Sequence, residues 1–161
     1  MRARSVPDPA LQLAVERLHA HYAHALDADK LEEWPQFFTE NGRYRITTAE
    51  NEERALPLSV LYAEGRAMMR DRIQSLRHAN IYEPQRYRHL TSCTLVERID
   101  DQRVKSVANF MVIRIMESGD TTLFASGRYV DRIVLSQEAQ YEERVVICDS
   151  RRFDTLLAIP L

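Results

Sequence analysis

The sequence predicts an α+β fold in which three helices pack on one face of a curved antiparallel sheet. In the first half of the chain, apolar residues recur mostly at helical spacing. From Gln85 onward, four long runs are rich in Val, Ile, Thr, Tyr and Phe, and short polar turns separate them. Short turns make neighbouring strands antiparallel, and helices gathered on one face of such a sheet form an α+β architecture.

The length indicates one domain over residues 1–161, and no linker or repeat interrupts the sequence. A net charge of -2 shows none of the excess of basic residues that is typical of proteins that bind nucleic acid or a membrane surface. No run approaches the ~20 apolar residues of a membrane-spanning helix. The basic start is followed by Pro-Asp-Pro instead of an apolar signal core, so we expect a cytoplasmic protein.

The first helix is expected to begin at Pro9 with Asp8 as its N-cap. Asp29 is a candidate cap for a second, short helix with Glu32 at the capping-box position, and Pro35 limits its length. The apolar side chains are Leu11, Val15, Leu18, Tyr22, Ala25 and Leu26 in the first helix and Trp34, Phe37 and Phe38 in the second.

The segment between the second helix and the long strands is expected to hold two short strands and a third helix. Asn41-Gly42 should end the second helix, and the third helix should bury Met68, Met69, Ile73 and Leu76. The expected order is a strand at Arg43–Thr48, a polar loop at Glu50–Arg54, a strand at Ala55–Tyr62 broken by Pro57, a helix at Gly65–Ala79 and a connector at Asn80–Pro84.

Four long strands are expected to complete the fold as an antiparallel meander. Cys93 and Cys148 lie singly in apolar runs, so reduced core thiols are favoured over a disulfide or a metal pair. The expected strands are Tyr87–Ile99, Val104–Met116, Leu123–Leu135 and Tyr141–Cys148.

The last seven residues, Thr155–Leu161, form an apolar tail that we expect to be docked. Burial of a large aliphatic side chain contributes roughly 1.5–3 kcal/mol, and this tail holds Leu156, Leu157, Ile159 and Leu161. It either closes the core of its own domain or lies in a contact with another chain.

The first helix carries the densest group of candidate functional residues. His21, His24 and Asp27 are spaced three apart and share a face, so they could meet a metal, whereas His19 is expected to point elsewhere. Without a distant ligand, a solvated face is the simpler interpretation. A pocket-lining dyad of His24 or Tyr22 with Asp27 is a second possibility, because His can act as a general base near neutral pH.

His89, on the first long strand, is the other candidate. Alternation places Tyr87, His89 and Thr91 on one face, toward the helices. A concave sheet could hold a small ligand there, between a His and an Asp on opposite walls. A buried His bonded to a carbonyl or carboxylate is the simpler alternative.

Most motifs of demanding chemistry are absent from the sequence. Four glycines cannot form a phosphate-binding loop, and there is no Gly-x-Ser-x-Gly nucleophile motif. No Cys-x-His or Cys-x-x-His pair is present to ligate a Rieske cluster. Taken by itself, the sequence looks like that of a protein that performs no difficult chemistry.

Three blocks of sequence span nearly the whole chain in order: Leu31–Phe38 with Tyr44–Thr47; Asp71–Arg77 with Ala79–Glu83 and Arg86–His89; and Phe110–Met116 with Phe124–Tyr129 and Asp149–Leu161. Together they resemble the small (beta) subunits of aromatic-ring-hydroxylating dioxygenases, which are Rieske non-haem iron oxygenases. The second block is most similar to the branch that serves aryl carboxylates such as salicylate, anthranilate or terephthalate. These subunits offer no catalytic residues to carry over, so we assign no catalytic, cofactor-binding or metal-binding residue to this chain.

This resemblance implies a cone-shaped fold like those of nuclear transport factor 2 (NTF2) and scytalone dehydratase. It implies a non-catalytic structural subunit, active in the catabolism of aromatic compounds, that stabilises an α3β3 heterohexamer with contacts between beta subunits. The Rieske [2Fe-2S] cluster and mononuclear Fe(II) are then expected in the large alpha subunit. A ferredoxin or reductase would deliver the electrons.

Two other functions remain open from the sequence. The first is a free-standing dehydratase or isomerase of the same fold, with His24, Asp27, Tyr22 or His89 as acid and base. The second is a homo-oligomeric module that binds a small ligand without turnover.

Overall fold

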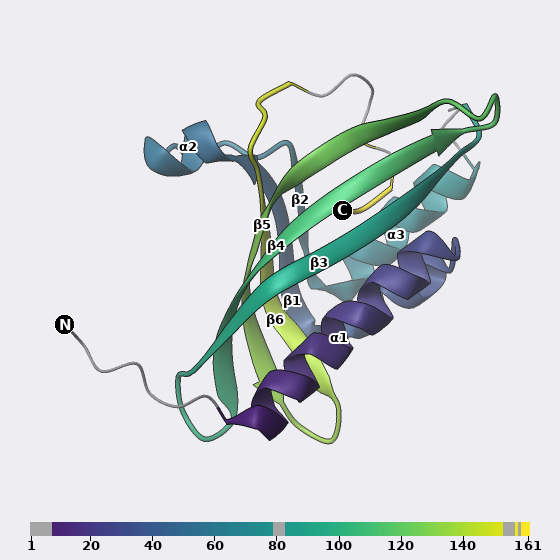
Figure 1. Ribbon diagram of the computed structural model, residues 1–161. Coiled ribbons are helices and arrows are strands. Elements are labelled where there is room, and N and C mark those ends of the chain that lie inside the picture. The colour runs from purple at the N-terminus through teal and green to yellow at the C-terminus, as the bar shows by residue number, and fades with distance from the viewer. Residues whose placement is uncertain (1–7, 79–82, 153–156, 158) are drawn as a thin grey trace.

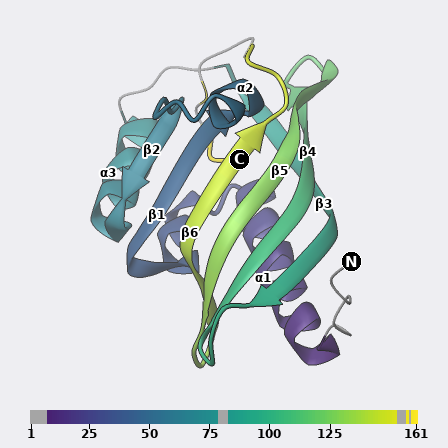
Figure 2. The same cartoon turned by 90° about the vertical axis from the view of Figure 1, so that its left-hand side faces the viewer.

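The computed structural model describes residues 8–78, 83–152, 157 and 159–161 of the chain. A strongly curved six-stranded sheet carries the helices α1, η1 and α3 on its concave side, while its other face is turned outward (Figures 1 and 2). The elements, in chain order, are α1 (Pro9–Asp27), η1 (Leu31–Phe37), β1 (Phe38–Thr48), α2 (Ala49–Glu53), β2 (Leu61–Glu64), α3 (Gly65–His78), β3 (Gln85–Arg98), β4 (Arg103–Met116), β5 (Thr121–Leu135) and β6 (Ala139–Cys148).

The strand order is β2-β1-β6-β5-β4-β3, which confirms the meander of the last four strands. The expectation of a purely antiparallel sheet is wrong in one place, because β1 pairs with β6 in parallel. The early strand β1 enters the sheet beside the last one, and α3 and the meander form the long crossover that a parallel pair requires. The sheet is therefore mixed.

The helix α1 begins as expected, since the Asp8 carboxylate accepts hydrogen bonds from the N–H groups of Ala10 and Leu11. The second helix is a 3-10 helix, and Asp29 does not cap it. Asp29 has a positive φ of 58° and its carboxylate binds Arg77 of α3 at 2.8 Å. An ion pair between two helices thus replaces the expected local cap.

The region between η1 and α3 differs most from expectation. Asn41-Gly42 does not end the second helix but lies inside β1, where the register against β6 shifts. Gly42 packs closely there, since a Cβ would lie 2.8 Å from the Phe38 Cβ. The expected polar loop at Glu50–Arg54 is largely the short helix α2, which Thr48 caps. Of the expected strand at Ala55–Tyr62, only the end at Leu61 and Tyr62 is extended into β2.

The third helix begins at Gly65 as expected and buries Met69, Ile73 and Leu76. Met68 was expected to face inward, but it is 46% exposed. It lies one position away from the buried stripe, so the helix turns it outward. Ala79 and most of the connector at Asn80–Pro84 lie outside the described residues.

The two cysteines lie in different environments. Cys148 is buried at the end of β6, and burial raises the pKa of its thiol to about 12. Cys93 was expected in the core but is exposed, with a positive φ of 53°, at a bulge where the β3–β4 register shifts. Both thiols are free.

The described residues of the apolar tail close the core of their own domain. Leu157, Ile159 and Leu161 are buried and belong to the same cluster as Tyr22 and Trp34. The sequence left open whether the tail closes its own core or contacts another chain, and the described tail residues close the core. Thr155 and Leu156 lie outside the described residues.

Candidate functional site

Asp27 at the end of α1 bonds directly to His89 of β3, so His89 is the buried His bonded to a carboxylate that the sequence offered as the simpler alternative. The His89 Nδ1 lies 2.6 Å from an Asp27 carboxylate oxygen, and the His89 main-chain N–H donates to both oxygens at 3.1 Å. Both side chains are at least nine-tenths buried. Because β3 is an edge strand, this carboxylate also satisfies a main-chain donor at the free edge of the sheet.

A groove of about 470 Å³ runs between α1 and β3 beside this pair. His24 lines it next to Asp27, and Tyr87, His89 and Thr91 share the inward side of β3 as expected. His21 does not line this groove; it lines, together with His24, η1 and the β5–β6 turn, an open hollow of about 920 Å³. Within the described part of the chain, no three His, Cys, Asp or Glu side chains are grouped to hold a metal.

His19 points away from His21, as expected, and lies in the core, where it is 2% exposed. Its Nδ1 lies 2.9 Å from an Arg144 nitrogen and 2.7 Å from the Tyr141 hydroxyl. A guanidinium can only donate, so this Nδ1 accepts and Nε2 carries the proton, directed to Ser106 at 3.3 Å. Burial, then the charge of Arg144, lowers the pKa of His19 to about 2.

Arg144 is the centre of the interior, and sequence reasoning missed it. Its guanidinium makes two 2.9 Å bonds to the Asp131 carboxylate and stacks 3.9–4.4 Å from the ring centres of three tyrosines. Both charged residues have no exposed side-chain surface. Alternation along β5 could have indicated Asp131, because it stands between the inward-facing Tyr129 and Ile133.

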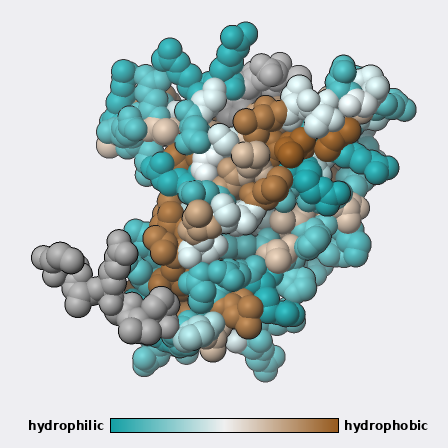
Figure 3. Space-filling model, in the orientation of Figure 1, coloured by the Kyte–Doolittle hydropathy of each residue, from teal (hydrophilic) through white to brown (hydrophobic). Residues whose placement is uncertain are grey.

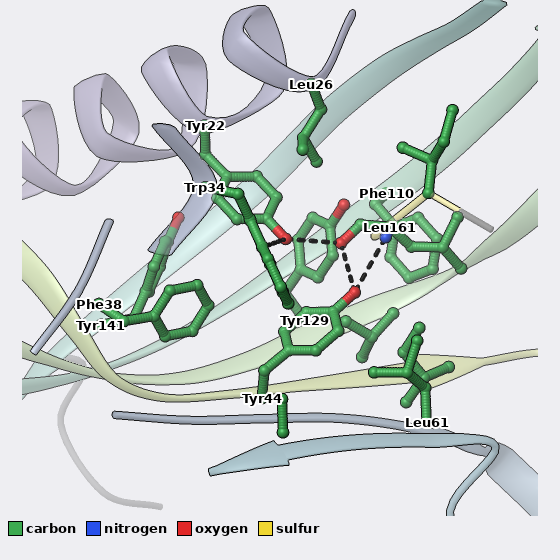
Figure 4. Close-up of a cluster of buried hydrophobic side chains, with 14 of the residues drawn as sticks. Tyr22, Leu26, Trp34, Phe38, Tyr44, Leu61, Phe110, Tyr129, Tyr141 and Leu161 are labelled. Atoms are coloured by element: carbon green, nitrogen blue, oxygen red, sulfur yellow. Dashed lines mark hydrogen bonds between the residues drawn. The ribbon is translucent and has the colours of Figure 1, made fainter. Parts of the chain in front are cut away.

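The interior of the curved sheet is filled by aromatic side chains and by Leu157, Ile159 and Leu161 of the tail. Tyr22, which the sequence paired with Asp27, instead donates its hydroxyl to the main-chain oxygen of Leu161 at 2.9 Å. Tyr44 donates to the same oxygen at 3.0 Å (Figure 4). The Trp34 ring, itself buried, packs edge-on against Tyr44. The groove beside Asp27 is therefore separate from a packed interior.

The outer face of the sheet exposes large apolar side chains. Leu90 of β3 lies opposite Met111 of β4, and Leu123 of β5 lies opposite Ile113 of β4. Leu90, Met111 and Leu123 are 48%, 42% and 60% exposed. Figure 3 shows hydrophobic surface gathered over this part of the sheet, toward the end of β4. We call these four residues the outer-face patch.

None of the helices in residues 8–78, the only part in which helices are described, is long and apolar enough to cross a membrane.

Comparison with known proteins gives consistent similarities. Residues 10–141 match the model of the SnoaL-like domain. The chain is 38% identical over 151 residues to the terephthalate 1,2-dioxygenase terminal oxygenase subunit beta 1 of Comamonas sp., covering 93% of this chain and 98% of that protein. It is 37% identical to the anthranilate 1,2-dioxygenase small subunit of Burkholderia cepacia, covering 89% and 90%.

A solved structure agrees with these sequence similarities. The crystal structure of a beta subunit assigned to an aromatic-ring-hydroxylating dioxygenase of Novosphingobium aromaticivorans superimposes with a TM-score of 0.87. The two sequences are 32% identical, and the match covers 95% of this chain and 98% of that one.

Proposed function

The chain belongs to the beta (small) subunits of aromatic-ring-hydroxylating dioxygenases, built on a SnoaL-like domain, and we propose that it stabilises the assembly of a larger, iron-containing alpha subunit. In this role it does no chemistry itself. Binding between two folded chains stabilises both by mass action. The expected assembly is an α3β3 heterohexamer in the cytoplasm.

The observation that carries this proposal is the outer-face patch. Apolar side chains such as Leu90, Met111 and Leu123 project from strands that neighbour one another in the sheet, so they form one contiguous surface. A contiguous exposed apolar surface typically marks a contact with another protein. We propose that the alpha subunit covers it, since an alpha chain is the partner that the family membership implies.

The cofactors are proposed to lie in that partner. The Rieske [2Fe-2S] cluster requires Cys and His ligand pairs, and the described residues offer no such group. A separate ferredoxin or reductase would supply electrons to the alpha subunit. Terephthalate and anthranilate, which appear in the names of the relatives, make an aryl carboxylate the substrate class that we propose for the complex.

The first experiment is purification of the tagged chain from its host under mild conditions, followed by native mass and metal analysis. We expect the chain to co-purify with an equimolar amount of a larger chain. The preparation should be brown and should contain iron and acid-labile sulfide. A colourless homo-oligomer without a partner would contradict the proposal and direct attention to the groove at Asp27 and His89.

The role of the outer-face patch is tested by replacing Leu90 and Met111 with Asp. We expect this double variant to remain folded alone and to lose the alpha subunit on purification. Leu13→Asp is the matched control, because Leu13 is also exposed, at 58%, but lies on α1. If the alpha subunit were retained while beta–beta contacts were lost, the patch would belong to copies of this chain instead.

The Asp27–His89 pair is the one observation that favours a second function, acid–base catalysis by the isolated chain. The interior is packed with side chains, so a substrate would have to bind in the groove of about 470 Å³ between α1 and β3 beside this pair. Loss of turnover of a small hydroxylated or ketone substrate in His89→Ala and Asp27→Asn would support this alternative. Unchanged activity in both would remove it.

A further inference from the structure

Inside the cone, Leu161 is held in the way that a protein holds a ligand. The hydroxyls of Tyr22 and Tyr44 converge on its main-chain oxygen, and its N–H donates to the Tyr44 hydroxyl at 2.9 Å (Figure 4). Leu161 itself has no exposed surface. Each polar main-chain atom of this residue that the structure describes thus meets a side chain from a distant part of the fold.

The two hydroxyls are fixed by contacts that do not involve Leu161. Trp34 Nε1 donates to the Tyr22 hydroxyl at 3.2 Å, so the Tyr22 proton is free to point toward the Leu161 oxygen. The Trp34 ring packs edge-on against Tyr44 with ring centres 5.0 Å apart, and the Arg144 guanidinium lies 4.4 Å from the centre of the Tyr22 ring. The donors are therefore pre-oriented for an oxygen acceptor.

The surroundings of the Leu161 side chain are apolar. It belongs to the buried cluster that includes Leu26, Leu61 and Phe110, and Figure 4 shows these side chains around it. The seat of Leu161 thus combines two hydroxyl donors for one oxygen with an enclosed volume for a branched aliphatic group. A small apolar carboxylic acid has that chemistry.

We propose that the seat of Leu161 is a binding site for small apolar carboxylic acids, which the chain fills with its own residue. A subunit whose proposed role is assembly thereby retains a ligand site in its interior. Removal of Leu161 leaves its volume empty and leaves the two hydroxyls buried without an acceptor. A carboxylic acid from solution then binds there, because it restores their hydrogen bonds.

The test uses 4-methylpentanoate, which reproduces the side chain and oxygen of leucine. Isothermal titration calorimetry compares the unaltered chain with a variant that lacks only Leu161. We expect saturable binding to the variant and none to the unaltered chain. Adding Tyr22→Phe to the variant should weaken binding about tenfold, because one donor to the acid is lost. The control ligand is 4-methylpentylammonium, which lacks an acceptor oxygen and should not bind.

Loss of Leu161 could unfold the chain, and this outcome has its own readout. In that case circular dichroism is recorded as 4-methylpentanoate is added, and refolding by the acid but not by the ammonium compound supports the proposal. Absence of both binding and refolding overturns it. Equal binding to the unaltered chain also overturns it, because the acid would then occupy another site.

Discussion

The carboxylate of Asp27 fastens the end of the first helix to His89 on the edge strand, through the His89 main-chain N–H at 3.1 Å and its ring Nδ1 at 2.6 Å. The two residues are 62 positions apart in the sequence. Gln12 makes a second link between the same elements, donating to the Thr94 carbonyl at 2.8 Å. The helix α1 thereby covers the open edge of the sheet, where unpaired main-chain groups would otherwise invite another strand.

Removing the Asp27 carboxylate should loosen this edge. We expect Asp27→Ala to lower the free energy of unfolding by about 2 kcal/mol, because a buried N–H and a ring nitrogen lose their acceptor. Urea denaturation measures the change. His24→Ala, at an exposed position on the same helix, is the control and should stay within about 0.5 kcal/mol of the unaltered chain. Equal effects would contradict a specific role for Asp27.

The buried ion pair should be costly to break and less costly to replace. Asp131→Ala leaves the Arg144 guanidinium buried without its carboxylate, and we expect it to cost about 3–5 kcal/mol. The double variant Asp131→Leu with Arg144→Met removes both charges and should be more stable than Asp131→Ala. Chemical denaturation of both variants gives the comparison. A double variant less stable than the single one would mean that the pair itself is strongly stabilising.

His19 should make the protein sensitive to acid. Its pKa of about 2 in the folded state lies below the value of 6.5 in the unfolded chain. Between these pH values the unfolded state binds the extra proton, so the contribution of His19 is intact above pH 6.5 and falls as the pH decreases. The loss is about 1.4 kcal/mol per pH unit.

Replacement of His19 by Gln tests this dependence. At pH 7 the variant should be less stable than the unaltered chain, because Gln does not reproduce the buried contacts of the His19 ring. It should lose less stability on acidification, because Gln cannot take up a proton. Urea denaturation between pH 7 and pH 5 measures both slopes. Parallel slopes for the two proteins would contradict the assignment.

Gly127 is required by close packing within the sheet. A Cβ at this position would lie 1.9 Å from the main-chain oxygen of Ile147 on β6. The backbone must move to admit it, so Gly127→Ala should cost at least about 1–3 kcal/mol. At Gly119 a Cβ would meet nothing within 4 Å and the φ of +92° is the constraint, so Gly119→Asn is the control and should cost less. Thermal unfolding compares the two.

Part of the fold could be predicted from local patterns. The cap at Asp8 and the apolar stripe of α1 depend on residues within a few positions of one another. The four long strands follow from alternation and short turns in the same way, and their observed bounds differ from the expected ones by at most two residues. The resemblance to the beta subunits likewise depended on blocks of sequence, and the comparisons confirm it.

The candidate site could be predicted only in part. The sequence placed His89 on the face of its strand that meets Asp27, because alternation is a local property. It could not place Asp29, which binds Arg77 of another helix in place of capping η1. It also gave no sign that His19 is buried, because its partners Tyr141 and Arg144 come from a strand far along the chain.

The sequence by itself determined the helices α1 and α3, the meander and the family, because these depend on neighbours along the chain. Only the tertiary structure decided that β1 lies parallel to β6, that Arg144 and Asp131 are buried together, and that Leu161 lies between Tyr22 and Tyr44. The physical reason is distance along the chain. Leu161 is 139 residues from Tyr22 and 117 from Tyr44, and such contacts form only when the whole sheet has closed around them.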